Sequence, residues 1–140
     1  MSVRNTFDGS LPIDASQVVH DITLTYTNGA GTNTMNVPSS YIKDGSVCIL
    51  LLPDVRNFNN TNNDIVNITI PNEIVPSQSL AIYGIRFSNA NAARYNIIAR
   101  LTSGSNIISL TTQDRLTMNE GNFTSEPITI YHYFITYQTN

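Results

Sequence analysis

Residues 18–27 read Val-Val-His-Asp-Ile-Thr-Leu-Thr-Tyr-Thr, and this stretch decides the fold class. Apolar or aromatic side chains stand at Ile22, Leu24 and Tyr26, with threonines between them. Successive side chains of a strand point to opposite faces, so a period of two predicts a half-buried β-strand. The strand is expected to end at the turn signal Asn28-Gly29-Ala30-Gly31.

Similar segments recur along the chain, each rich in Ile, Val, Thr or aromatic residues and bounded by Pro, Gly, Asn or Ser. They are residues 34–37, 47–52, 64–70, 80–87, 95–102, 107–111 and 127–137. The segment 34–37 is expected to stop at Pro38, and no segment keeps helical spacing of apolar residues for three turns. The sequence therefore predicts an all-β protein, a single-domain, jelly-roll-like antiparallel β-sandwich of about eight or nine strands.

The domain is expected to span residues 17–140. Residues 1–16 lack clear periodicity and are interpreted as an N-terminal arm that ties the domain to another protein. The longest uninterrupted apolar run, which begins at Val47, is too short to cross a bilayer, so no membrane insertion is expected.

The composition indicates an uncharged polar exterior. Charged residues make up 12% of the chain, about half the usual share, whereas Asn and Thr together supply about a quarter. Such a surface suits a protein outside the cell or on a particle. With a net charge of -3, one lysine and scattered arginines, the chain has no basic cluster for phosphates, so nucleic acid is not an expected partner.

The chain offers little for catalysis, and we expect a protein that binds or assembles. His20 and His132 both fall on apolar faces of predicted strands, where a histidine is more often a core residue than a catalyst. Cys48 is the single cysteine and is interpreted as a buried, inert thiol. No catalytic group, metal site or cofactor is predicted.

The last predicted strand carries more apolar surface than one sheet face can bury. Tyr131, Tyr133, Ile135 and Tyr137 point to one side of it, and Ile128, Ile130, His132 and Phe134 point to the other. Only one of these sets can lie in the core of a small sandwich. We interpret the first set as a subunit interface of a homotrimer; a covering loop or the N-terminal arm is the alternative.

An Asn-rich stretch after the strand 47–52 is the candidate ligand-binding loop. The expected binding residues in it are Asn57, Phe58, Asn59, Asn60 and Asn62, with the turn 28–33 beside them. Amides bond to sugar hydroxyls, and an aromatic ring can stack on a sugar. A purely connecting, soluble loop is the alternative.

The order of these features resembles a known group of proteins. A strand opens after Gly45 and closes at Pro53, an Ile-rich strand leads to Ile70-Pro71, and residues 102–108 precede the closing Tyr133–Tyr137 segment. This is similar to the head domains of phage tail fibres and giant-virus surface proteins, trimeric jelly rolls with C1q-like and tumour-necrosis-factor-like architecture. The resemblance implies a homotrimer on the virion surface.

Two functions follow from that resemblance. One is a non-enzymatic, fibre-head-like module that binds a host receptor or glycan. The other is a structural minor capsid, penton or decoration protein that contacts other virion proteins through residues 1–16.

Overall fold

The computed structural model describes residues 17–60, 65–89, 94–113, 120–121, 123 and 127–140. These residues form antiparallel strands and one short 3-10 turn, η1 Asn72–Ile74. The strands are β1 His20–Asn28, β2 Thr34–Asp44, β3 Val47–Leu52, β4 Val55–Asn59, β5 Val66–Thr69, β6 Leu80–Ser88, β7 Arg94–Leu101, β8 Ile107–Gln113, β9 Glu120–Gly121, β10 Pro127–Ile130 and β11 Tyr133–Gln138. No helix in this part of the chain is long and apolar enough to cross a membrane.

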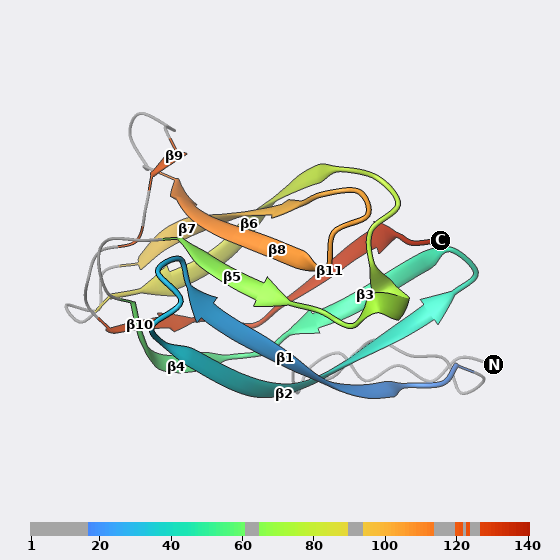
Figure 1. The fold of residues 1–140 in the computed structure, drawn as a ribbon, viewed down its shortest axis with the longest axis horizontal. Coiled ribbons are helices and arrows are strands. Elements are labelled where there is room, and N and C mark those ends of the chain that lie inside the picture. The colour runs from blue at the N-terminus through green and yellow to red at the C-terminus, as the bar shows by residue number, and fades with distance from the viewer. Residues whose placement is uncertain (1–16, 61–64, 90–93, 114–119, 122, 124–126) are drawn as a thin grey trace.

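The strands belong to one curled sheet with the order β11-β3-β2-β1-β5-β8-β7-β6-β10-β4, and β9 pairs with β8 (Figure 1). The two ends of this order meet. β4 follows β3 after Pro53 and Asp54, and β11 follows β10 after Tyr131 and His132. Because β11 pairs with β3 and β10 pairs with β4, the four strands form two halves of one long ribbon that closes the sheet. The all-β, jelly-roll-like prediction is confirmed.

Two Greek keys make up this closed sheet. In the first, β1, β2 and β3 are neighbours in sequence order, and β5 returns to pair with β1. In the second, β6, β7 and β8 are neighbours, and β10 returns to pair with β6. A fourth strand that lies beside the first defines the Greek key. The keys join along β5–β8 and along the β3/β4 and β10/β11 ribbon.

The core lies inside this curled sheet and follows the predicted period of two. Leu24 and Tyr26 of β1 are fully buried, and their threonine neighbours are not. Ile68 of β5, the partner of Tyr26 across the ladder, and Leu110 of β8, the next strand in the sheet, are also buried. The alternation in residues 18–27 therefore reports one inward and one outward face, as the sequence predicts.

Strand β2 is longer than expected, because Pro38 does not end it. Pro38 pairs with Thr23 of β1, and β2 continues to Asp44. Strand β3 pairs with β2 only from Tyr41 onward, so β2 has a strand on one side only at Pro38. A proline is tolerated at such a position because its missing N–H removes no ladder bond on the open side.

The histidine prediction is wrong: both side chains are exposed. His20 stands at the outer end of β1, and its ring stacks on Tyr41 with centroids 4.8 Å apart. His132 lies in the two-residue corner between β10 and β11, outside the ladder. Both positions lie at strand ends, beyond the reach of the core.

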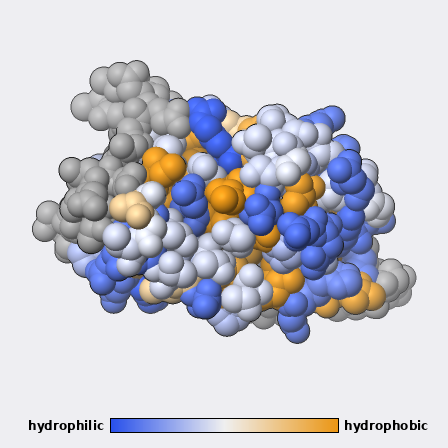
Figure 2. Space-filling model, viewed as in Figure 1, coloured by the Kyte–Doolittle hydropathy of each residue, from blue (hydrophilic) through white to orange (hydrophobic). Residues whose placement is uncertain are grey.

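Outer surfaces of the sheet carry hydroxyl and amide groups in place of charge. Thr25 Oγ1 donates to Asn36 Oδ1 at 3.0 Å, and Ser109 Oγ donates to Asn67 Oδ1 at 3.1 Å, each across neighbouring strands. The face in Figure 2 is mostly hydrophilic or neutral, with apolar colour in small separate patches. These bonds pair polar side chains across neighbouring strands of a surface that carries few charges.

Candidate functional site

The β1–β2 turn is built around the buried amide of Asn28. Asn28 Oδ1 accepts from the N–H groups of Thr32 and Asn33 at 2.9 and 3.0 Å, and Nδ2 donates to Thr32 Oγ1 at 2.9 Å. Gly31 takes a positive φ of 73° that few other residues adopt. This explains why the Asn-Gly-Ala-Gly signal predicts a turn here.

The same turn lies against the Asn-rich segment. Asn33 Nδ2 donates to the backbone oxygen of Asn59 at 2.9 Å, and the Gly29 N–H donates to Ile65 O at 2.7 Å. The structure thus brings together the two segments that the sequence singled out, at one end of the sheet. We call this end, formed by residues 28–33 and the end of β4, the turn end.

Within the Asn-rich segment, however, only part is available for a ligand. Residues 55–59 form strand β4, not a loop, and Phe58 is buried in the core, where Ile128 is its partner across the ladder. Asn60 is also buried, and Asn62 lies outside the described residues. Asn57 and Asn59 remain exposed. The proposed stacking of Phe58 on a sugar is therefore wrong, because its ring fills the core.

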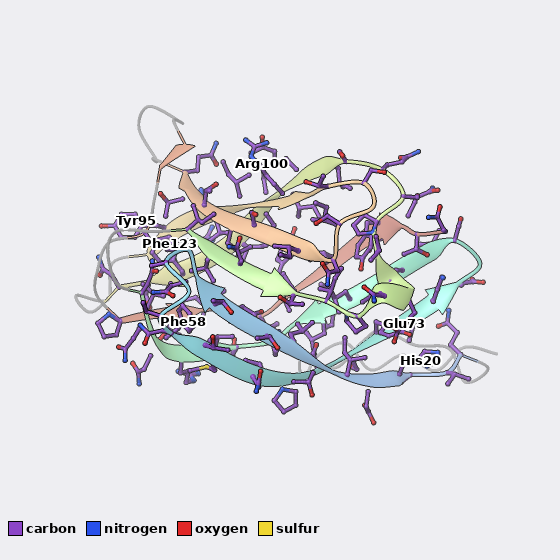
Figure 3. The ribbon with its side chains drawn as sticks, in the orientation of Figure 1. His20, Phe58, Glu73, Tyr95, Arg100 and Phe123 are labelled. Atoms are coloured by element: carbon purple, nitrogen blue, oxygen red, sulfur yellow. The ribbon has the colours of Figure 1, made fainter. Side chains whose placement is uncertain are left out.

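Phe58 lies near an aromatic cluster under the turn end. Phe87 packs edge-on against Phe123 with centroids 4.7 Å apart and stacks with Tyr95 at 5.4 Å. Phe58, Tyr95 and Phe123 gather at one end of the molecule, far from Glu73 and His20 (Figure 3). Of Phe87, Phe123 and Tyr95, only Tyr95, which is 36% exposed, reaches the surface.

Only part of the tyrosine row of the last segment reaches the surface, and its assignment as a subunit interface is wrong for Ile135 and Tyr137. Ile135 and Tyr137 are buried in the core, and Tyr137 Oη donates to Ile74 O at 2.7 Å. Tyr131 and Tyr133 are half-buried and contact their own chain: Tyr131 Oη lies 3.0 Å from Ser88 Oγ, and Tyr133 Oη donates to Tyr83 O at 3.3 Å.

The corner between β10 and β11 explains this outcome. Ile128 and Ile130 of β10 point inward, yet in β11 the inward residues are Ile135 and Tyr137. The buried residues thus have even numbers before the corner and odd numbers after it. Tyr131 and His132 lie outside the ladder, so the chain crosses the corner with a change of parity. A single strand over 127–137 does not exist.

Cationic groups gather on the outward surface of β4, β10 and β6, which we call the β4–β10–β6 face. Its residues are Arg56, Asn57, Arg86, Thr129, Tyr131 and, beneath Tyr131, the buried Ser88. Arg86 lies between the buried Ile85 and Phe87, so its exposed side chain points outward. The side chain of Arg56 is 71% exposed on β4.

A bulge widens this face at β4. Val55 pairs with Ile130 and Phe58 pairs with Ile128, so Arg56 and Asn57 together oppose Thr129. Asn57 takes a left-handed φ of 56°, and its N–H donates to Thr129 Oγ1 at 3.4 Å. The extra residue places an arginine and an amide side by side on the outward surface.

Asp54 is the acidic group beside this face. Its carboxylate accepts from the His132 N–H at 2.7 Å, lies 3.4 Å from His132 Nδ1 and lies 3.9 Å from Arg56 Nη2. The aspartate thus fixes the corner between β10 and β11. Because these groups are largely exposed, the ion pair with Arg56 is weak and leaves its guanidinium able to bind another anion.

Buried titratable groups lie away from the site and suit a structural role. Cys48 is buried, as the sequence predicts, and burial raises the pKa of its thiol to about 11, which favours the neutral form. Burial also raises the pKa values of Tyr26 and Tyr137 well above the usual range. The described residues contain no group of three or more His, Cys, Asp or Glu side chains that could hold a metal ion.

Sequence reasoning missed Arg86, and it placed Tyr131 in a subunit interface and not beside an arginine. The alternation Ile85-Arg86-Phe87 was a usable signal, because it places the arginine on the outward side of its strand. That β10 lies between β4 and β6, however, follows from the closure of the sheet. Local sequence does not encode this pairing.

Comparison with known proteins gives a fold relative. No protein-family model matches the sequence, and no curated protein matches it. Among solved structures, the chain is similar to the reovirus attachment protein sigma1, solved in complex with alpha-2,3-sialyllactose, with a TM-score of 0.52 and 12% identity. The match covers 89% of this chain and 66% of that chain, just under two thirds. At this identity the likeness shows a shared fold.

Proposed function

We propose that this protein is a virion-surface module that binds a host receptor, in the first instance a glycan. The observation that carries the proposal is the shared fold with a viral attachment protein whose structure holds a sialylated sugar. The outer surface supports it, since threonine, serine and asparagine groups cover the sheet and an amide-lined turn end faces outward. Hydroxyls and amides are the groups that hydrogen-bond sugar hydroxyls.

A glycan array with the purified full chain, paired with binding to host cells before and after removal of surface sugars, tests this function. Binding to a defined set of glycans, with loss of cell binding after the sugars are removed, supports it. An array without signal together with cell binding that ignores the sugars would rule out a glycan receptor.

We further propose that the protein acts without catalysis and as a homotrimer, as in the heads that the sequence resembles. Because Ile135 and Tyr137 are buried within their own chain, the proposed trimer contact does not include these two residues. Light scattering checks this directly, because a trimer has three times the 15.5 kDa of one chain. A monomeric mass would contradict the trimer and leave the glycan proposal standing.

A structural role in the shell is the alternative outcome. It predicts that removal of residues 1–16, which lie outside the described residues, abolishes incorporation into particles while the domain stays folded. Loss of glycan binding without loss of incorporation in site variants supports receptor binding instead.

A further inference from the structure

From the geometry of the β4–β10–β6 face we infer a binding site for an acidic glycan, one whose sugar carries a carboxylate, held between Arg56 and Arg86 above Tyr131. This inference rests on the proposed glycan-binding function and names its ligand class and its site. The turn end lacks arginine in the described residues 28–33 and 59–60, so the two candidate sites predict different ligands.

Charge selects the ligand class. The whole chain has a net charge of -3, yet this face presents two exposed guanidinium groups. Within the described part of the chain, Arg86 has no salt bridge, and the pair between Arg56 and Asp54 is a weak contact at 3.9 Å. A guanidinium presents a planar fork that matches a carboxylate, so these groups favour an anion of that shape.

The neighbours of the two arginines select a sugar. Tyr131 Oη lies 3.0 Å from the Oγ of the buried Ser88, and this contact holds the half-buried ring against the outward surface. Thr129 and the exposed amide of Asn57 continue the polar lining toward β4. Uncharged donors and acceptors around a ring suit a sugar, whose hydroxyls need partners and whose apolar face can lie on an aromatic side chain.

Spacing suits one sugar unit. β4 and β6 both flank β10, so their backbones lie about 10 Å apart. One sugar can therefore lie across β10, its carboxylate on one guanidinium and its hydroxyls toward the other. The Asp54 contacts with the His132 N–H hold the adjoining corner in place, so the face is formed before the ligand arrives.

The experiment uses the full chain and saturation-transfer NMR with three soluble probes: alpha-2,3-sialyllactose, lactose as the same core without the acid, and sulfated lactose. We expect transfer to sialyllactose alone. Arg86→Gln and Arg56→Gln should each weaken its binding about tenfold or more, since each removes a charge-assisted pair. Arg86→Lys should lose part of that affinity, because it keeps the charge without the fork.

Arg100→Gln is the matched control, and its binding should equal that of the parent chain. Arg100 lies on β7, four residues beyond Asn96, the residue that pairs with Arg86, and this spacing puts it about 13 Å away along the strand. Its side chain points away from the body of the molecule (Figure 3). Each variant must also unfold at the parent midpoint, so that lost binding is not lost folding.

Three results would overturn the inference, and they separate it from the proposed function. Sialyllactose binding that survives both Arg86→Gln and Arg56→Gln places the ligand elsewhere and leaves glycan binding intact. Equal binding of lactose or sulfated lactose removes the carboxylate requirement but keeps a sugar. Absence of binding to all three probes, together with a blank glycan array, rejects both proposals.

Discussion

Tyr26 and Tyr137 are both buried, but only the hydroxyl of Tyr137 has a hydrogen-bond partner among the described residues, so replacing each should change the free energy of unfolding differently. Tyr137 Oη donates to Ile74 O at 2.7 Å and so ties β11 to the η1 turn. Tyr26 is equally buried, but its hydroxyl has no hydrogen-bond partner within the described residues. Both are replaced by phenylalanine in the test.

The expected costs follow from the hydrogen bonds. Tyr137→Phe removes a donor and leaves the Ile74 carbonyl without it in a buried setting, which should lower the free energy of unfolding by about 1–3 kcal/mol. Tyr26→Phe removes a buried hydroxyl that no described group satisfies, so its effect should lie within about 1 kcal/mol of zero, on either side.

Urea unfolding followed by circular dichroism measures both. A lower midpoint with an unchanged slope for Tyr137→Phe alone is the expected result, because the slope reports the surface exposed on unfolding. If Tyr26→Phe destabilised the protein as much as Tyr137→Phe, the reasoning from hydrogen-bond partners would be refuted.

Three further predictions test the packing. Gly84→Ala should lower the free energy of unfolding by about 2–3 kcal/mol, because φ is 102° and the added Cβ would lie 3.1 Å from the Tyr133 hydroxyl. Gly104→Ala, where φ is 77° and the space is open, should lower it by only about 1 kcal/mol, and equal shifts of the unfolding midpoint would contradict the contact with Tyr133. Ile135→Asp should abolish folding because it buries a charge, and Thr136→Asp should leave the melting temperature nearly unchanged because Thr136 is exposed. The opposite result would mean that Ile135 faces outward. Burial raises the pKa of Cys48 from 9.0 to about 11, so as the pH rises the thiol ionises first in the unfolded chain, and the free energy of unfolding should fall between pH 9 and 11. The fall should be less steep in Cys48→Ala, and parallel curves for the two proteins would contradict this.

The sequence was sufficient for the strands, because each strand of this sheet has one buried face. Leu24 and Tyr26 report that face without any knowledge of their partners. The turn at Asn28 was equally visible, since its amide bonds to the backbone of its own turn and needs no distant residue. Local chemistry determines both features, and local chemistry is what a sequence shows directly.

Features that depend on the closure of the sheet could not be predicted. The prediction of an outward tyrosine row takes residues 127–137 as one straight strand, whereas the corner at Tyr131 and His132 changes which residues face inward. The asparagines around Phe58 predict a loop, yet pairing with β10 extends that segment into β4 and buries the ring. In both cases a partner strand far away in the sequence decided the outcome: Phe58 pairs with Ile128, 70 residues away, and Tyr133 pairs with Leu52, 81 residues away.

The position of the β4–β10–β6 face links binding to folding. β4 continues the first Greek key from β3, and β6 opens the second, so Arg56 and Arg86 stand on opposite sides of the seam where the keys meet. A ligand that contacts both arginines spans β10, a strand of four residues that pairs with β4 on one side and β6 on the other. Such a ligand binds the closed sheet and not the open one, so it must stabilise the closure by mass action. The two arginines should therefore be coupled through the ligand, with Arg56→Gln costing less binding once Arg86 has been replaced.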